Sequence, residues 1–309
     1  MILSQVGPAA VLSESTTVIL SPVVLLLLMG GATTVAVRRW RQLWGLMVRA
    51  QRPDPRFDAW GARVGAVLKY ALGQARMLRW PYSGVLHVFI YWGFLVLASA
   101  IAQGIIEALW QGFRMNDVPL SGAIAFMQDL FFVLVITGCV MALINRLIVR
   151  PSRFRGSHTG DAVLILCWIM VLVTCMELDY ATRIAQITSA NPLPEALAPW
   201  RPVASALARI FEPLGARSDA LVVLHGAFFW AHLALVFSFL VYLGYSKHLH
   251  IITATFNVLF RNLDAKGALP TPDLEAVGVD HFGASRLEHL SWKDMLDLYT
   301  CTECGRCQA

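Results

Sequence analysis

Charged side chains are scarce in this chain. Of its 309 residues, 15% are Asp, Glu, Lys or Arg, whereas 57% are hydrophobic. Soluble domains carry about 25% charged residues and do not bury so large an apolar fraction in their cores. Lipid is therefore expected to solvate part of the chain. The formal net charge of +5 is modest and forms no pattern typical of a nucleic-acid surface, so no nucleic-acid partner is predicted.

The first residues lack basic side chains altogether. No Lys or Arg occurs between Met1 and Val18. A cleaved secretory signal begins with a positively charged region, which this segment does not have. The first apolar run is therefore expected to be a true membrane span.

Five stretches are long and apolar enough to cross a bilayer, for which about 20 residues suffice. Backbone groups in lipid must pair within their own segment, so these stretches are expected to be helices. The predicted fold class is an all-α membrane protein, built as a bundle of five transmembrane helices. The expected spans are 17–37, 84–107, 122–146, 160–178 and 219–245.

Basic residues are concentrated in two of the segments that connect these spans. The segment between the first and second spans has ten Lys or Arg residues, and the one after the third span has four. By contrast, Arg114 is the one basic residue between Glu107 and Leu120. The positive-inside rule then predicts that the N-terminus lies outside and the C-terminus inside.

The chain divides into three parts by composition. Residues 1–255 hold the five spans, 256–290 form a polar cytoplasmic linker, and 291–309 begin a separate unit. Ser291 followed by Asp294 is typical of a helix N-cap with a capping acid, so a short helix is expected to run into the cysteines. In the outer loop, Arg201–Phe211 is expected to form a short amphipathic helix.

Five histidines lie in or beside the spans, and a histidine in a span is a functional candidate. They are His87, His225, His232, His248 and His250. Neutral imidazole is a good axial ligand of haem iron. At 100° per residue His225, His232 and His250 share one helical face, provided that the fifth helix continues past Ser246; His248 then points away. The alternative is that these histidines hydrogen bond neighbouring helices.

A six-coordinate haem needs a second ligand from another helix. His87 is the one histidine in the other spans, and its favoured partner is His250, with His232 as the second choice. The sequence therefore predicts one b-type haem near the cytoplasmic side. A second haem nearer the outer face lacks a histidine in the second span and would need another ligand, such as methionine.

Three basic residues are predicted at the cytoplasmic level of this haem. Arg76, Arg79 and Lys247 are candidates for charge-assisted contacts to the haem propionates. The alternative is that they belong to the ordinary excess of basic residues on the inner side.

The last residues contain three cysteines at C-x2-C-x2-C spacing: Cys301, Cys304 and Cys307. This is the beginning of a ferredoxin-type [4Fe–4S] binding run, in which a fourth cysteine follows three residues later. The printed sequence stops before that position, so the motif is incomplete. A zinc site is the alternative, although zinc sites commonly use two C-x2-C pairs. A disulfide is disfavoured in the cytoplasm.

Several segments resemble known families. Gly73–His87 with Tyr91–Phe94 resembles the second span of the nitrate reductase gamma-subunit-like cytochromes b, and Tyr245–His250 followed by Asn257 resembles the end of their fifth span. Trp292–Cys307 resembles the fused membrane iron–sulfur oxidoreductases related to heterodisulfide reductase. Electron-transfer-flavoprotein:menaquinone oxidoreductases belong to that group.

The resemblance implies specific ligands. It places haem b between His87 and His250, and it places His232 at the ligand position of an outer haem, whose partner position is occupied by Leu97. It further implies electron transfer between a cytoplasmic iron–sulfur or flavoprotein module and menaquinone in a bacterial-type cytoplasmic membrane. No side chain is expected to perform covalent catalysis, and the expected partners are lipid, quinone and a soluble electron-transfer flavoprotein or iron–sulfur donor.

Two other functions compete with this prediction. One is a haem b anchor subunit of a nitrate- or sulfite-type reductase, against which the fused cysteine run argues. The other belongs to a different class, a haem-free membrane scaffold or transporter whose histidines join helices. A haem absorbance band would exclude the haem-free scaffold or transporter, because the electron-transfer protein and the reductase anchor subunit both require haem.

Overall fold

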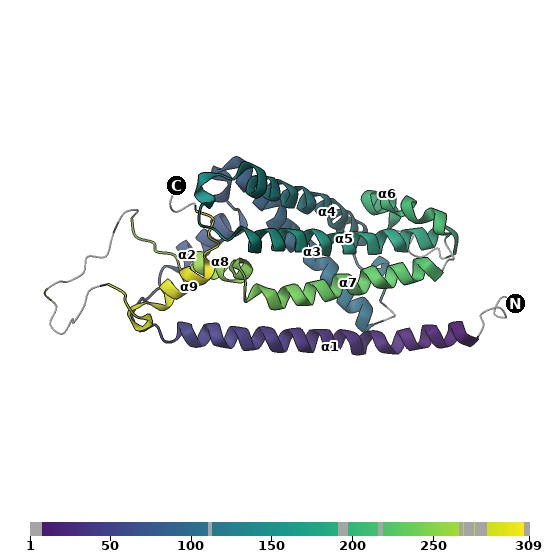
Figure 1. Ribbon diagram of the computed structural model, residues 1–309, viewed down its shortest axis with the longest axis horizontal. Coiled ribbons are helices and arrows are strands. Elements are labelled where there is room, and N and C mark those ends of the chain that lie inside the picture. The colour runs from purple at the N-terminus through teal and green to yellow at the C-terminus, as the bar shows by residue number, and fades with distance from the viewer. Residues whose placement is uncertain are drawn as a thin grey trace.

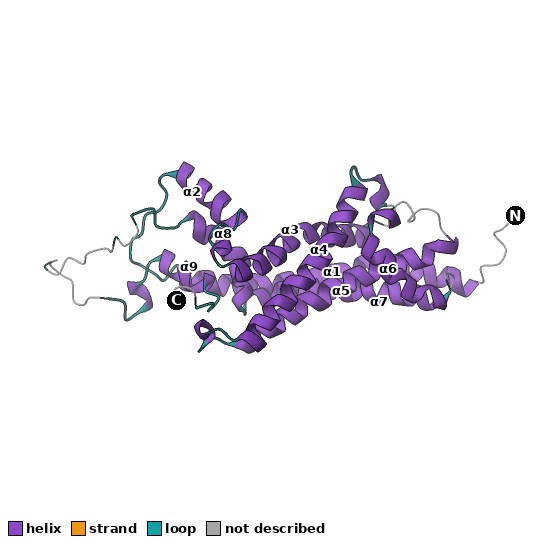
Figure 2. Cartoon of the chain, turned by 90° about the horizontal axis from the view of Figure 1, so that it is seen from above, coloured by secondary structure: helices purple, strands orange, loops and turns teal. Residues whose placement is uncertain are grey.

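The computed structural model describes residues 8–110, 113–190, 197–215, 219–265, 268, 275 and 283–305, without the side chains of 8–21 and 187–190. Within these ranges the regular elements are helices and no strand is formed (Figure 1, Figure 2). The predicted all-α fold class is thereby confirmed for the described residues. The predicted boundaries 1–255, 256–290 and 291–309 of the three parts stay a prediction.

Five helices are long and apolar enough to cross a membrane, and they lie along the long axis of the molecule (Figure 1). Their membrane-spanning parts are 22–47, 81–109, 121–149, 159–186 and 219–243, which confirms the five predicted spans. The helices are α1 (Pro8–Met47), α3 (Pro81–Leu109), α4 (Ser121–Ile144), α5 (Thr159–Ala190) and α7 (Asp219–Leu243). A π-helical turn, Asn145–Val149, continues α4.

Small residues let α3 and α4 approach each other closely. A Cβ on Gly138 would lie 2.9 Å from the Leu86 carbonyl oxygen and 3.0 Å from Cγ1 of Ile90, and a Cβ on Gly93 would overlap Val135. Close approach over glycine is a common way for helices to associate in lipid, where dispersion contacts replace the hydrophobic effect. The second turn of α3 is thereby fixed against α4.

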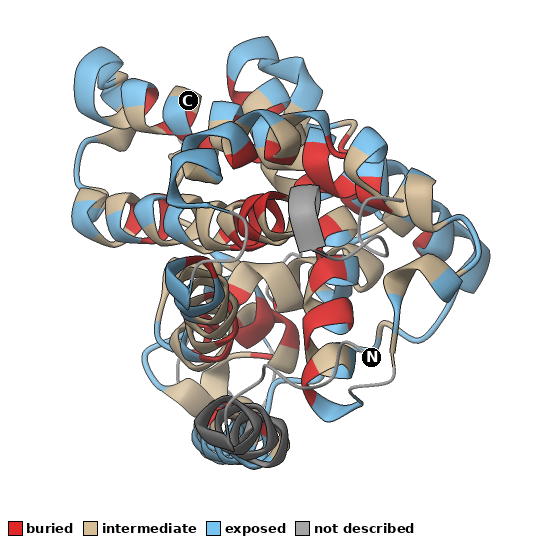
Figure 3. Cartoon of the chain, turned by 90° about the vertical axis from the view of Figure 1, so that its right-hand side faces the viewer, coloured by how far each residue is buried: buried red, intermediate tan, exposed pale blue. Residues whose placement is uncertain are grey.

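The remaining spans close the bundle through apolar layers. α5 packs on α7, where Ile165 meets Phe239 and Leu243. α1 lies at the margin and packs on α7 through Leu25 and Ala32. Figure 3 shows that buried residues gather between the helices while the outward faces are exposed. Exposed Leu, Val and Ile on these outward faces are expected for a bundle that lipid surrounds.

The fifth span ends earlier than predicted. α7 stops at Leu243, and a 3-10 turn, Lys247–Leu249, precedes α8 (His250–Leu259). Arg39 of α1 donates its Nε to the Gly244 carbonyl (2.9 Å), and Asp161 of α5 accepts the Lys247 backbone N–H (3.2 Å). These partners satisfy the backbone groups that a broken helix exposes. The helix does not continue past Ser246, so the condition under which His232 and His250 would share one helical face is not met.

Short helices cover the two ends of the bundle (Figure 1). One end, called the cysteine end here, carries α2 (Trp60–Ala66), α8 and α9 (Trp292–Thr300). The opposite end carries α6 (Pro202–Phe211) and is called the α6 end. Both short helices that the sequence predicts, over 201–211 and after Ser291, are confirmed. Ser291 and Asp294 form the capping box that starts α9.

Candidate functional site

Three of the candidate histidines come together at the cysteine end. His250 opens α8, His248 lies in the turn before it, and their ring centroids are 5.2 Å apart. His87, on the second turn of α3, stacks on Tyr91 at 6.3 Å. His87 and Arg146 both contribute to lowering the pKa of His248, so both lie near it. The prediction that His248 points away from His250 is therefore wrong, because the helix break turns both rings to one side.

Two of these imidazoles are in the charge state that metal ligation requires. Burial lowers the pKa of His248 to about 3 and holds the pKa of His250 below its ordinary value. Both rings are therefore neutral at pH 7. Nδ1 of His250 lies 2.8 Å from the Lys247 carbonyl oxygen, which makes Nδ1 the donor and leaves the Nε2 lone pair available. Metal-ligating histidines are commonly oriented in this way.

Two arginines at this end have buried nitrogens without an acceptor. Nη1 of Arg146 and Nε of Arg153 find no hydrogen-bond partner in the described part of the chain. A buried guanidinium group favours an anion, and a haem carries two propionates. Of the three predicted propionate residues, Arg76 and Arg79 are exposed, with Arg76 stacked on Tyr70 at 4.7 Å. The third, Lys247, pairs with Glu303 at 2.7 Å. The role of all three stays a prediction, whereas Arg146 and Arg153 are additional candidates.

These features fit a b-type haem at the cysteine end. The ligand candidates His87 and His250 come from two different elements, and His250 presents an oriented, neutral imidazole. The buried guanidinium nitrogens of Arg146 and Arg153 would be satisfied by propionate oxygens. In the sequence, Arg146 and Arg153 served only as evidence for the orientation of the chain in the membrane. Their buried nitrogens, which make them candidates for the propionate contacts, cannot be read from the sequence.

His232 is oriented like His250 but lies in a different environment. Its Nδ1 is 3.0 Å from the Leu172 carbonyl oxygen, and its buried Nε2 has no partner among the described residues. The ring lines a cavity between α3, α5 and α7, together with Gly104, Met176 and Phe229. α3 offers no histidine at this cavity, and Met176 is the methionine that shares it. The outer haem therefore lacks a histidine pair here.

A chain of ion pairs extends from this cavity to the α6 end. Arg183 binds Glu107 at 2.6 Å and Asp179 at 3.1 Å, and Asp179 binds Nδ1 of His225 at 2.6 Å. Gln103 donates to Glu107 at 2.8 Å. Paired charges of this kind are tolerated at membrane depth because each compensates the desolvation of its neighbour.

A second buried polar group adjoins the first. Arg201 lies 3.5 Å over the ring of Tyr180 and donates to Gln128 at 2.5 Å. The Asp129 carboxylate accepts from the Val203 and Ala204 N–H groups and so caps α6.

Three acidic residues of α4 and α5 are buried in the bundle. Asp129, Glu177 and Asp179 are only 1%, 0% and 5% exposed. Asp129 accepts backbone N–H groups of α6, and Asp179 pairs with side chains of α5 and α7. Glu177 lies beside Asp129 of α4. The sequence contains one local indication of this buried polar group. Glu177, Tyr180 and Arg183 are spaced three residues apart and so lie near one side of the same helix.

The cysteine run begins where α9 ends. Cys301 is exposed, Cys304 is half-buried, and neither forms a disulfide. The loop between and after them is left-handed at Glu303 (φ 51°) and Gly305 (φ 69°). Cys307 lies outside the described residues. Within the described part, no group of three side chains is arranged to hold a metal, so the [4Fe–4S] prediction is not tested by the geometry.

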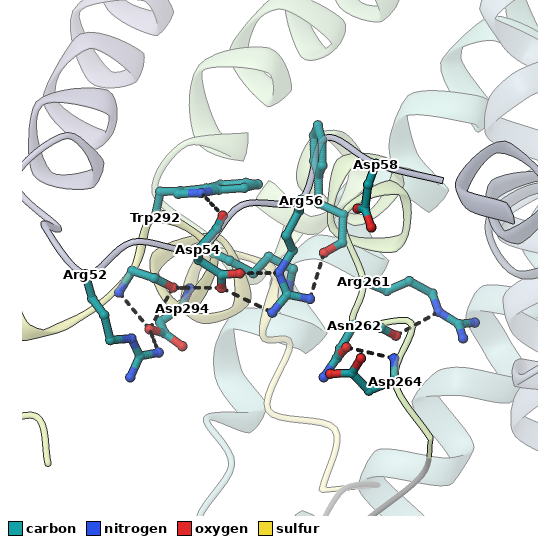
Figure 4. A network of polar contacts seen from close by, with 12 residues as sticks. Arg52, Asp54, Arg56, Asp58, Arg261, Asn262, Asp264, Trp292 and Asp294 are labelled. Carbon is teal, nitrogen blue, oxygen red and sulfur yellow. Dashed lines mark hydrogen bonds and ion pairs between the residues drawn. The ribbon is translucent and has the colours of Figure 1, made fainter. Parts of the chain in front are cut away.

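The segment 51–58 fastens α9 to the bundle, as Figure 4 shows. Arg52 binds the Asp294 carboxylate at 2.6 Å, and the Trp292 indole donates to the Asp54 carbonyl oxygen at 2.9 Å. Trp292 also packs against Phe57 and Phe260. The helix that leads into the cysteines is therefore held at a fixed place on the cysteine end.

The chain is similar to two bacterial oxidoreductases. It is 29% identical over 255 residues to a probable iron–sulfur-binding oxidoreductase, FadF, of Bacillus subtilis, which covers 82% of this chain and 34% of that protein. It is 28% identical over 257 residues to the EtfAB:quinone oxidoreductase of Syntrophomonas wolfei, covering 82% and 35%. The chain thus spans about a third of the length of these relatives. No protein-family model and no solved structure matches it.

Proposed function

We propose that this chain is the membrane part of a quinone-linked oxidoreductase. Electrons pass between a cytoplasmic iron–sulfur or flavoprotein module and quinone in the bilayer, through b-type haem. The observation that carries this proposal is the placement of the cysteine run beside the half-buried His248 and His250 at one end of a five-span bundle. The similarity to an EtfAB:quinone oxidoreductase supports an electron-transfer flavoprotein as donor and a quinone, such as menaquinone, as acceptor.

The proposed haem residues lie at the cysteine end. His87 and His250 are the proposed axial ligands of one haem b, with Arg146 and Arg153 beside the propionates and with Arg76 and Arg79 as the candidates from the sequence. When bound, the haem supplies one-electron transfer, and the protein sets its axial ligation and the polarity around it.

Cys301, Cys304 and Cys307 are the proposed ligands of a [4Fe–4S] cluster, for which further ligands are needed beyond these three. The positive-inside rule places this end in the cytoplasm and the α6 end outside, in a bacterial-type cytoplasmic membrane. In this orientation the soluble donor reaches the cluster end directly from the cytoplasm.

The cavity beside His232 is too small for a quinone head group, because its volume of about 20 Å³ has room for about one water molecule. Tyr180, Arg183 and His232 line it, so it is the proposed place of a water molecule on a proton path to the quinone. Reduction of a quinone to the quinol takes up two electrons and two protons. The paired Asp179 and His225 connect the cavity toward the α6 end, where protons are available from water.

A redox difference spectrum tests the haem assignment. The detergent-purified protein is reduced with dithionite, and haem is quantified as the pyridine haemochrome. We expect a b-type spectrum at about one haem per chain that is lost in His87→Ala and His250→Ala. His289→Ala, which changes a histidine outside the spans at the same end, is the matched control and is expected to keep the haem.

The outcomes separate the competing functions. A wild-type protein without haem would refute the electron-transfer role of the spans and favour the haem-free scaffold or transporter. A haem that is reduced by quinol but not through the cysteine run would favour the anchor subunit of a nitrate- or sulfite-type reductase. About two haems per chain would assign a second ligand pair, with Met176 as the candidate partner of His232.

A further inference from the structure

Glu303, which lies between Cys301 and Cys304, makes an ion pair with Lys247. The carboxylate and the ammonium nitrogen are 2.7 Å apart. The Lys247 side chain is only 13% exposed, and its ammonium also donates to Ser157 Oγ at 3.1 Å and to the His158 carbonyl oxygen at 2.9 Å. An ammonium has three N–H donors, so all three are used. This is not the loose pair of two solvated side chains that is common on protein surfaces.

Lys247 also connects directly to the proposed haem ligand. Its backbone carbonyl oxygen accepts from Nδ1 of His250, and its backbone N–H donates to Asp161. The Asp161 carboxylate accepts the hydroxyl of Tyr242 at 2.6 Å as well. A single residue therefore contacts the cysteine loop with its side chain and orients the histidine with its backbone.

Two further contacts fix the cysteine loop in this place. The Glu303 carboxylate accepts the His158 backbone N–H at 3.2 Å. Gly305 adopts a left-handed conformation so close to the Arg153 carbonyl that a Cβ would overlap it. The cysteine loop is thereby complementary to the 153–158 segment and to Lys247, and Glu303 is its charged contact.

We propose that the Lys247–Glu303 ion pair docks the cluster loop on the membrane domain and sets the position of the iron–sulfur cluster relative to the haem held by His250. This inference rests on the proposed function. Lys247 and Glu303 are positioning residues: neither is a ligand of iron, and both act through the loop that carries the ligands. The docked arrangement places the point of electron entry at the histidine pair.

Charge reversal tests the docking contact. Glu303→Lys and Lys247→Glu each replace the attraction by repulsion, and the double variant restores a pair of opposite charges. Hydrogen exchange of residues 157–161 and 245–250 in the purified protein reports docking without relying on activity. We expect about fivefold to tenfold faster exchange in each single variant, since an ion pair is worth a factor of up to about five and repulsion adds to its loss. The double variant is expected to return toward the wild-type rate.

Electron paramagnetic resonance gives an independent readout. In protein with reduced cluster and ferric haem, the power saturation of the cluster signal depends on the distance to the haem iron. The single variants are expected to show weaker relaxation enhancement at unchanged haem and iron content. Glu288→Lys, which reverses one charge of the exposed Arg49–Glu288 pair (3.5 Å) at the same end, is the matched control and is expected to change neither measurement.

The outcomes distinguish this inference from the proposed function. Unchanged exchange and unchanged saturation in both single variants would refute the docking role while leaving the haem and cluster in place. Recovery in the double variant would assign the effect to the two charges; it is expected to be partial, because the swapped carboxylate faces the His158 carbonyl oxygen and the swapped ammonium faces the His158 N–H. If the wild type has no haem, the proposed function fails, whereas the exchange measurement still tests the contact by itself.

Discussion

Replacing Gly138 by alanine is expected to loosen the α3–α4 contact beside the proposed haem ligand His87. The added Cβ would lie 2.9 Å from the Leu86 carbonyl oxygen, 3.0 Å from Cγ1 of Ile90 and 3.2 Å from Cβ of Phe89. The carbonyl oxygen belongs to the backbone of α3 and cannot rotate away, so the two helices must separate by a few tenths of an ångström. His87 follows Leu86 and moves with it.

The size of the effect follows from two opposing terms. Overpacking of a tight core costs about 1–3 kcal/mol, and alanine is favoured over glycine in a helix by about 0.5–1 kcal/mol. The net loss for Gly138→Ala is therefore between about 0 and 2.5 kcal/mol. Gly226→Ala in α7 is the matched control, because nothing lies within 4 Å of the added Cβ. That variant is expected to be stabilised by up to about 1 kcal/mol.

Reversible unfolding by SDS in mixed micelles measures both free energies of unfolding. The haem content of the same samples reports whether the displacement of α3 reaches His87. The reasoning would be refuted if Gly138→Ala were as stable as Gly226→Ala, since the close approach of α3 to α4 would then not exist. Loss of stability with full haem content would confine the effect to packing.

Three further predictions concern both ends of the molecule. Ser291→Ala removes the N-cap of α9 and is expected to cost about 1 kcal/mol, seen as faster hydrogen exchange over residues 292–300. Burial acts to raise the pKa of Asp294, but hydrogen bonds from Ser291 and the charge of Arg52 outweigh it and hold the pKa below its usual value. The contribution of the ionised Asp294 to stability is thus complete above about pH 4 and is lost as the pH falls through the lowered pKa. After correction for intrinsic exchange, the hydrogen-exchange protection of α9 should be flat from neutral pH to about pH 5 and should decline in stronger acid. Asp179→Asn leaves the charges of the Arg183 cluster unbalanced and is expected to destabilise the protein by about 3–5 kcal/mol in the same SDS titration; a loss below about 1 kcal/mol would contradict the pairing.

The spans were predictable from sequence because lipid imposes length and composition on each helix separately. The end of α7 was not, since Tyr245-Ser246-Lys247 is compatible with a continuing helix. The break depends on Arg39 and Asp161, which lie in other helices and satisfy the exposed backbone groups. When helix periodicity is applied across such a break, the side-chain direction around the helix axis is wrong for every residue beyond the break.

Residue type alone makes His87, His250 and the cysteines candidates from the sequence, and their roles as ligands stay predictions. The sequence does not reveal the candidates that depend on burial. Arg146 and Arg153 resemble every other basic residue on an inner loop, and only their unpartnered buried nitrogens distinguish them. Likewise Asp179 acquires its role from His225 and Arg183 together, and His225 lies 46 residues further along the chain.

The two polar regions of the bundle are separated along the same pair of helices. Between Asp161 and Glu177, α5 has no charged residue, and between Gly226 and Tyr242, α7 has His232 as its one ionisable side chain. Apart from His232, the middle of this helix pair therefore has no side chain that commonly transfers protons, whereas electron transfer needs only cofactors at suitable spacing. In the proposed function electrons enter at the cysteine end and protons reach the quinone from the α6 end. The two reactants then approach from opposite sides of the membrane, so quinone reduction moves charge across it.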